Sequence, residues 1–397
     1  MKARVPVFVC VLVVAASVIW ITEGATATTA SSLTWDARAA AAYLDQRQGW
    51  WESWPKSARD HGTVCVSCHT AVPYALARPR LGAVLHESDA PAAERKLFDD
   101  VVTRVRDWHN VKPFYGDTTA AGNAKAIQSR GTEAVLNALI LASRDERTGV
   151  ISPEARQAFT NMFALQEAEG DNEGAWPWLD FGLRPWESRT ATYFGAALAA
   201  IAIGIEPQSF AASGEIRPHV GRLRAYLRHH LDQSFWRKLL RRDDPALFNR
   251  AMLLWASARL PSLITLGEQR EIVNALWDAQ DPDGGWRLSK LGFWRQAADV
   301  PPELEGDGFA TGLVTYALEQ AASPPGEPHV ARALAWLARH QDGVTGRWHA
   351  SSLNKKRDPT TNVGKFMSDA ATSYAVLALI GSRPTPAPTP LGTTHTR

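Results

Sequence analysis

The sequence predicts an all-α protein: a single (α/α)6 toroid of about six helix-pair repeats over residues 35–382, with a short cysteine motif inside the first repeat. Three observations lead to this fold class. Turn segments that end in glycine and tryptophan recur along the chain, alanine-rich apolar segments follow them, and amphipathic segments lie between. Pairs of this kind bury their apolar faces by stacking on their neighbours, and six stacked pairs close into a ring.

The turn segments contain six of the 16 tryptophans of the 397-residue chain. Tryptophans fall near positions 50, 110, 176, 236, 286 and 348, so the period is 50 to 70 residues. In the turns, glycine permits a tight reversal, and glutamine and tryptophan can cap and stack against the next unit. Glutamine precedes tryptophan in four segments, which are 45–50, 166–176, 280–286 and 341–348. A degenerate copy covers 232–236, and 108–117 fills the remaining gap.

The segments after these turns predict the inner helices. They are apolar on nearly every side, which is typical of buried helices. The segment 330–340 is instead amphipathic, so it predicts an outer helix with one face in water. The clearest inner segments are 132–139, 189–198, 308–313 and 369–379.

Residues 65–69 read Cys-Val-Ser-Cys-His. This spacing is the attachment signature of a c-type haem, in which Cys65 and Cys68 bind the porphyrin and His69 binds the iron. We therefore predict a covalent haem c. Two alternatives remain open: a local disulfide or redox dithiol between the cysteines, and a metal site completed by His69 with another histidine. A thioredoxin-like dithiol would be expected near a βαβ pattern, which this sequence lacks.

The ligand on the other face of the iron is not specified by a local pattern. No methionine follows the motif within 90 residues, so the compact cytochrome with a nearby distal methionine is not encoded. The distal ligand is a histidine or methionine from elsewhere, or the site is open. The candidates are His61, His86, His109, Met162 and Met367.

The N-terminus predicts export. Lys2 and Arg4 precede an uncharged apolar run over 5–21, and small residues follow at 24–27, which is the pattern of a secretory signal peptide over residues 1–27. An uncleaved membrane anchor is the alternative, and in both cases the body lies in the periplasm or otherwise outside the cytoplasm. Residues 383–397 are rich in proline and threonine and predict a disordered tail.

The net charge of the chain is +2, which gives no reason to expect a nucleic-acid partner. The densest basic segment, 237–242, is typical of a solvated helix face, with peripheral contact to anionic lipid as the alternative.

The cysteine motif aligns with an inner helix of the repeat. Residues 68–77 and 368–377 match in their small residues, tyrosine and apolar tail, which predicts that His69 occupies the position of Asp369. A chance match between two alanine-rich helices is the alternative. We expect inner helices to begin near one rim of the central cavity, which would place haem and carboxylates there together. Carboxyl groups desolvated beside such a cavity acquire a raised pKa and can act as general acids. The candidate catalytic residues are Asp307, Asp369 and Glu187, with helix capping or pairing to arginine as the alternative role.

The turns at 280–286 and 341–348 resemble the QW repeats of the squalene–hopene cyclase, oxidosqualene cyclase and protein prenyltransferase superfamily. The resemblance covers most of residues 40–382 in repeat pattern, and it implies a toroid around an apolar cavity for an isoprenoid chain. The sequence has one toroid where the hopene-forming cyclases pair two. Their Asp-x-Asp-Asp-Thr-Ala acid signature is missing, and 303–311 is the closest segment. Cys10 lies in the predicted signal peptide, so the exported protein would have no cysteine outside the motif for a prenyltransferase-type zinc site.

Three functions are compatible with these features. The favoured one is an exported haem-dependent oxidoreductase that binds or oxidatively transforms an apolar, isoprenoid-like substrate, with a periplasmic redox partner. The second is an electron-transfer or sensing cytochrome in which the toroid is a scaffold. The third is a redox-silent terpene cyclase or isomerase that uses acid catalysis by Asp307 or Asp369.

Overall fold

The computed structural model of the chain describes residues 34–116, 124–239, 246–294 and 296–381, all within one compact unit that begins at Thr34. The described residues form helices and loops, with isolated bridges but no strand, so the all-α prediction is confirmed for them. The predicted signal peptide and proline-rich tail lie outside the described residues, and so do residues 240–242 of the basic segment 237–242.

Two sets of helices alternate along the chain. One set is buried on nearly all sides, and the other buries one face. The buried set comprises α2 (Ala71–Val84), α4 (Ala124–Asp145), α6 (Thr192–Ile205), α9 (Ala246–Arg259), α11 (Gly308–Gln320) and α13 (Phe366–Gly381). The second set comprises α1 (Ala37–Ser53), α3 (Ala92–Arg106), α5 (Pro153–Phe163), α8 (Arg217–Leu239), α10 (Leu266–Asp278) and α12 (Pro328–Arg339). Short elements are η1 (Asp60–Gly62), α7 (Gln208–Ala212), η2 (Leu288–Leu291) and η3 (Val363–Lys365).

Sequence composition explains the two sets. Helix α6 is built from alanine, isoleucine and other small or apolar residues, and every side chain from Tyr193 to Ile203 is buried. Helix α12 buries only Val330, Ala333, Leu334, Trp336 and Leu337, at the three- and four-residue spacing of one helix face. Its other face carries the polar residues that meet water.

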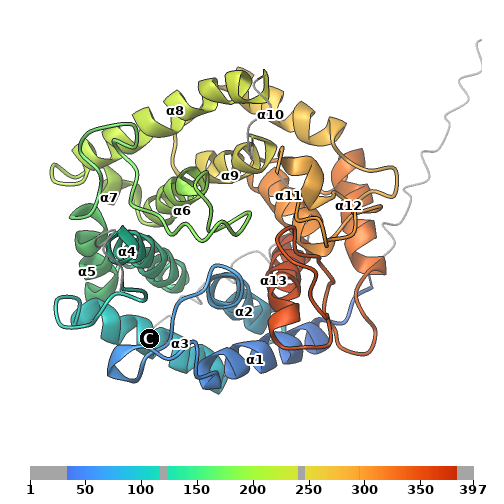
Figure 1. Cartoon of the computed structure of the whole chain (residues 1–397), viewed down its shortest axis with the longest axis horizontal. Helices are drawn as coiled ribbons and strands as arrows, with labels where there is room; N and C mark the ends of the chain where they lie inside the picture. Colours follow the sequence, from blue (N-terminus) through green and yellow to red (C-terminus); the bar gives the residue numbers. More distant parts are fainter. Residues whose placement is uncertain (1–33, 117–123, 240–245, 295, 382–397) are drawn as a thin grey trace, which may run out of the picture. The chain divides into compact units, whose positions relative to one another are not determined.

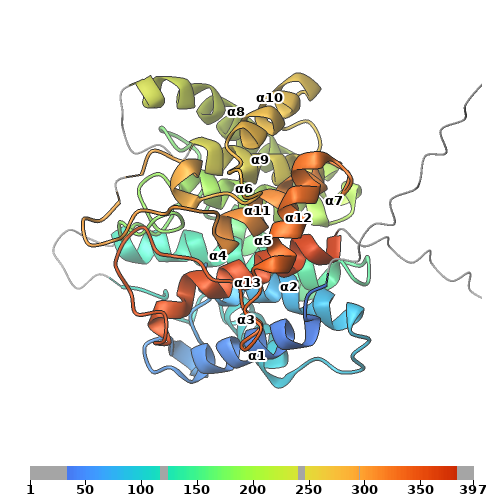
Figure 2. The same ribbon diagram turned by 90° about the vertical axis from the view of Figure 1, so that its right-hand side faces the viewer.

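The buried helices pack on one another in a cycle. Helix α2 packs on α4, α4 on α6, α6 on α9, α9 on α11 and α11 on α13, and α13 packs back on α2. Figure 1 shows these six helices within the set formed by α1, α3, α5, α8, α10 and α12. Both views show α1 and α3 side by side (Figures 1 and 2), in agreement with their direct packing.

Glutamine side chains connect three of the turns to the next helix of the second set. Gln280 Nε2 donates to the carbonyls of Gly284, in its own turn, and His329, at the start of α12. Gln341 Nε2 donates in the same way to Gly346 and to Asp36, which caps α1. The last turn is therefore bonded to the first helix. Gln166 repeats the pattern with Gly174 and His219.

The tryptophans of these turns are anchored in a similar way. Trp286 Nε1 donates to the Leu276 carbonyl at 2.8 Å, and Trp348 Nε1 donates to the Leu337 carbonyl at 2.7 Å. Each ring is fully buried, so its one polar atom needs this acceptor. The turn is thus fixed to the helix that precedes it, as well as to the one that follows.

No helix among the described residues combines the length and apolarity that a bilayer crossing requires.

The glycines of these turns allow close approach of the next helix. Gly346 has φ = +75°, and a Cβ there would lie 2.3 Å from the Ala39 carbonyl carbon of α1. We expect Gly346→Ala to lower the free energy of unfolding by roughly 2–4 kcal/mol, because it adds left-handed strain to a backbone clash. Urea unfolding measures this change.

Gly343→Ala is the matched control, because Gly343 lies in the same turn with no atom within 4 Å of its Cβ position. Its unfolding midpoint should match the wild type within error. Equal midpoints for the two variants would mean that the contact between the last turn and α1 contributes nothing to stability.

Candidate haem-attachment site

The Cys65–His69 segment lies between η1 and the first turn of α2. Cys65 N donates to the Ser57 carbonyl at 2.8 Å, and Trp51 Nε1 donates to the Cys65 carbonyl at 2.7 Å. The Ser67 hydroxyl accepts the amides of Thr70 and Ala71, which are among the free N–H groups at the start of α2. The motif is therefore held in a defined loop that leads directly into a buried helix.

Both thiols of the motif are free and buried. Cys65 and Cys68 are each 5 % exposed, and they form no disulfide. Burial raises the pKa of Cys65 to about 11, and burial together with the Glu187 charge raises the pKa of Cys68 well above its usual range. Reactive redox cysteines have a lowered pKa, so this environment is unlike that of a catalytic dithiol.

The His69 imidazole lies among aromatic rings. Phe366, from the start of α13, stacks on it with centroids 3.9 Å apart, and Trp51 meets it edge-on at 5.0 Å. Trp186 completes the surroundings at 6.4 Å. Desolvation by these neighbours, with the nearby Arg47 charge, lowers the pKa of His69 to about 3. The imidazole is therefore neutral at physiological pH, which is the form that binds a metal.

A chain of hydrogen bonds determines which His69 nitrogen is available. His69 Nδ1 lies 2.7 Å from Thr70 Oγ1, and Thr70 Oγ1 donates to Asp369 Oδ2 at 2.8 Å. Because the hydroxyl has one hydrogen, which it gives to Asp369, it accepts from His69. The proton of the imidazole is therefore on Nδ1, and the Nε2 lone pair is available to a ligand.

Asp369 is fully engaged by donors. Arg47 Nε and Nη2 contact it at 2.7 and 3.0 Å, and the Tyr43 and Thr70 hydroxyls donate to it as well. The carboxylate is 2 % exposed; burial raises its pKa, and the bonds to Arg47 oppose that rise. This geometry favours a role in orienting His69 over the predicted role of proton donor to a substrate.

Glu187 has a different environment. It lies in the loop before α6, where its backbone pairs with Leu183 and Phe181. Its charge acts on both Cys65 and Cys68, which places it beside the thiols. Its carboxylate accepts no hydrogen bond from the residues that the structure describes, and burial raises its pKa to about 7. Of the three predicted acids, Glu187 is the one near the motif whose carboxylate accepts no hydrogen bond among the described residues.

Asp307 is the N-cap of α11. It accepts the amides of Phe309, Ala310 and Leu288 at 2.8 to 2.9 Å. Burial, with the Glu303 charge, raises its pKa to about 7. Three backbone donors on one buried carboxylate are typical of a helix cap, which was the alternative role considered for it.

The five distal-ligand candidates are widely distributed, and none is in contact with His69. Met367 is buried in the first turn of α13, next to the Phe366 that stacks on His69. Met162 is buried in α5, His61 and His109 are exposed, and His86 follows α2, about 20 Å along that helix from His69. Among the described residues, no group of three or more His, Cys, Asp and Glu side chains is arranged to hold a metal ion.

Sequence reasoning missed the residues that surround the motif. Arg47, Thr70 and Trp51 come from the first repeat, whereas Trp186 and Phe366 come from distant loops and helices. The one available signal was Thr70 itself, which directly follows the motif.

The centre of the buried helices contains aromatic side chains from several of them. Trp255 of α9 meets Tyr316 of α11 at 5.1 Å and Tyr374 of α13 at 6.3 Å. Phe309 contacts both Tyr374 and Trp186, at 5.6 and 5.0 Å. An aromatic cluster therefore extends from the central helices to the ring beside His69.

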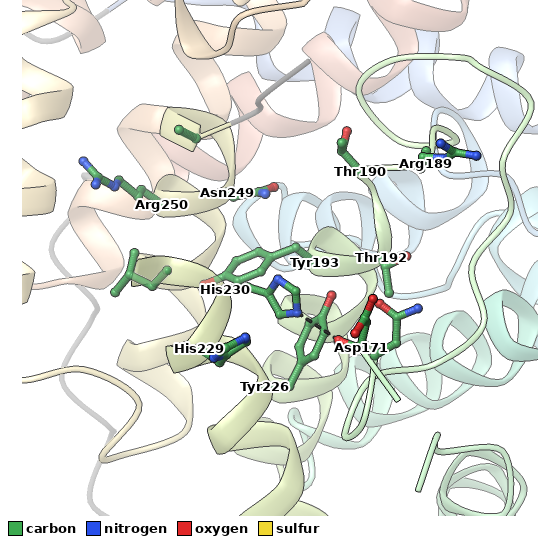
Figure 3. Close-up of a pocket in the computed structure, with 13 residues that line it drawn as sticks. Asp171, Arg189, Thr190, Thr192, Tyr193, Tyr226, His229, His230, Asn249 and Arg250 are labelled. Carbon is green, nitrogen blue, oxygen red and sulfur yellow. Dashed lines mark hydrogen bonds between the residues drawn. The ribbon is translucent and has the colours of Figure 1, made fainter. Parts of the chain in front are cut away.

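A separate pocket of about 380 Å³ opens between the starts of α6 and α9 and the middle of α8. Figure 3 shows His229, His230 and Tyr226 of α8 facing Tyr193 and Asp171, with His230 Nε2 3.1 Å from the Asp171 carbonyl. Its lining is largely polar and includes no residue of the cysteine motif.

No protein-family model matches this sequence, and no curated protein matches it.

The Glu187 environment predicts a pH dependence of stability in the haem-free chain. Its pKa rises from 4.5 to about 7 on folding, so between these values the folded state binds more protons than the unfolded state. The free energy of unfolding should therefore fall as pH rises from 4.5 to 7. Glu187→Gln removes this dependence, and should be more stable than the wild type by roughly 2–3 kcal/mol at pH 8 and equal to it near pH 4.

Urea unfolding at pH 4.5 and pH 8 measures the difference. Glu154→Gln is a control with the opposite sign, because Arg106 lowers the pKa of Glu154, so this variant should lose stability at pH 8. If wild type and Glu187→Gln keep the same difference in stability at both pH values, Glu187 is solvated in the folded protein.

Proposed function

We propose that this chain is an exported protein that carries one covalent haem c on Cys65 and Cys68, with His69 as an axial ligand of the iron. The observation that carries the proposal is the 2.7 Å contact of His69 Nδ1 with the Thr70 hydroxyl, which would leave Nε2 to bind the iron, directly after two free, buried thiols. These are the donor atoms that a c-type haem needs. When bound, the haem iron supplies one-electron and oxygen chemistry.

We also propose that residues 35–382 form the (α/α)6 toroid expected from the repeats. The cyclic packing of the buried helices supports it, and so do the repeated glutamine bridges. In this arrangement the haem lies where the first and last repeats meet, because α2 and α13 begin beside each other through the Thr70–Asp369 bond.

The favoured activity is oxidation of an apolar, isoprenoid-like molecule. The aromatic cluster from Trp255 to Trp186 offers an apolar surface that reaches the imidazole. Trp51 and Phe366 exclude water from His69, and Glu187 is placed to hold or move a proton near the haem. A periplasmic redox partner would exchange electrons with the iron.

Electron transfer without substrate chemistry is the second candidate. Phe366 stacks on His69 and also contacts Trp50 and Trp54, each at 6.0 Å. Both tryptophans are partly exposed, so this set of rings connects the imidazole to the surface. The cyclase-like alternative lacks such support, because Asp307 and Asp369 are already occupied by backbone and arginine donors.

The first experiment is a pyridine haemochrome spectrum with intact mass, on protein exported in a host with c-haem maturation machinery. We expect a c-type band and the added mass of one haem. The Cys65→Ala/Cys68→Ala double variant should lose both. An unmodified mass and no band in the wild type would contradict the proposal.

Ligand binding then separates the two activities. An oxidoreductase with an open or displaceable distal site should bind carbon monoxide in the ferrous state and cyanide in the ferric state. An electron-transfer protein with two strong ligands should resist both. Spectral titration with isoprenoid alcohols tests the substrate class.

A further inference from the structure

We propose that Asp369 is a positioning residue which, through the Thr70 hydroxyl, sets the electron donation of His69 and so holds the haem at a low reduction potential. This inference rests on the proposed haem site and deepens it, because it names the residues that would stabilise the ferric state of the haem.

The geometry brings three elements to one point. Thr70 is the N-cap of α2, Asp369 lies in the first turn of α13, and Arg47 with Tyr43 projects from α1. Thr70 and Asp369 are both 2 % exposed, so water does not compete with their 2.8 Å hydrogen bond. The Arg47 bonds to both carboxylate oxygens, at 2.7 and 3.0 Å, prevent the carboxylate from turning away.

Hydrogen bonds in series polarise one another. The hydroxyl of Thr70 gives its proton to an anionic oxygen, which makes its own oxygen a better acceptor for the His69 Nδ1 proton. An imidazole whose Nδ1 proton is drawn toward an acceptor donates more strongly from Nε2, as is seen when carboxylates orient metal-binding histidines. Stronger donation stabilises the ferric ion more than the ferrous ion.

A second buried ion pair shows that helix packing alone does not require hydrogen bonds that lead from a carboxylate to a histidine. Glu133 of α4 pairs with Arg104 of α3 at 2.5 Å, and both side chains are fully buried. This pair joins a buried helix to a helix of the second set, as Asp369 and Arg47 do. Glu133, however, contacts no threonine that leads to an imidazole; Thr63 bonds to Arg104 instead. The Arg47–Asp369 and Arg104–Glu133 ion pairs can therefore be compared: both join a buried helix to a helix of the second set, but only Asp369 is linked to a histidine.

The test is a spectroelectrochemical titration of the haem-loaded full chain. Thr70→Val keeps the shape and the Arg47–Asp369 pair but removes the hydroxyl. At a fixed potential near the midpoint, we expect the ratio of reduced to oxidised haem to rise about tenfold, which is about +59 mV for a one-electron couple. Thr70→Ser keeps the hydroxyl and should restore the wild-type potential.

Two further variants complete the test. Glu133→Gln should lower stability and change the potential by much less than Thr70→Val does, because Glu133 acts on Cys65 only through its charge and has no hydrogen bond that leads to His69. Tyr43→Phe removes a competing donor from Asp369 without changing shape, so it should lower the ratio of reduced to oxidised haem about threefold. Tyr43→Phe decides the question if Thr70→Val does not fold.

The outcomes separate this inference from the proposed function. Absence of haem from the wild type contradicts the proposed function. Haem in all variants, with the Thr70→Val and Tyr43→Phe potentials equal to that of the wild type, overturns the role of Asp369 and leaves the haem site intact. A shift in Glu133→Gln as large as that in Thr70→Val would likewise overturn it, because the effect would then come from general loosening.

Discussion

The arrangement of the helices depends on one interaction, in which a glutamine side chain in a turn bonds to the start of a helix in the next repeat. Gln166, Gln280 and Gln341 each donate to their own turn and to the next helix of the second set. In each case the acceptor is a backbone carbonyl at the start of that helix, so the bond fixes where the next helix pair begins. The third bond reaches α1, which joins the last repeat to the first and leaves no unpaired end between them.

The cysteine motif lies at this junction. Its histidine precedes the N-cap of α2, and it contacts the Asp369 carboxylate of α13 through Thr70. The same ion pair, Arg47 with Asp369, therefore joins α1 to α13 and supports the histidine. The contact between α1 and α13 and the orientation of His69 both depend on Arg47 and Asp369, so a substitution of either residue affects both. A readout specific to the haem, such as its potential, is needed to separate the two effects.

The all-helical class and the alternation of buried and amphipathic helices could be predicted because hydrophobic periodicity is local. The alignment of residues 68–77 with 368–377 stays a prediction, and it did not indicate that Thr70 and Asp369 would be in contact. The contacts of Asp369 could not be predicted either, because a carboxylate alone does not reveal that Arg47 and Tyr43 will donate to it. Glu187 was predicted as an acid without its neighbours; its position beside the thiols depends on how the loop before α6 folds back. For Asp307, the local sequence pattern of a helix cap predicts the observed backbone contacts, whereas the role of a general acid does not.

The separation between Thr70 and Asp369 is 299 positions. In the export that we propose, the amino-terminal part of the chain would cross the membrane first, so the cysteines and His69 would arrive outside before Asp369 does. The proposed covalent attachment needs only the local pentapeptide, whereas the orientation of the imidazole by Asp369 requires that α13 has already packed against α2. Haem attachment and the final orientation of His69 would then be two separate steps of maturation.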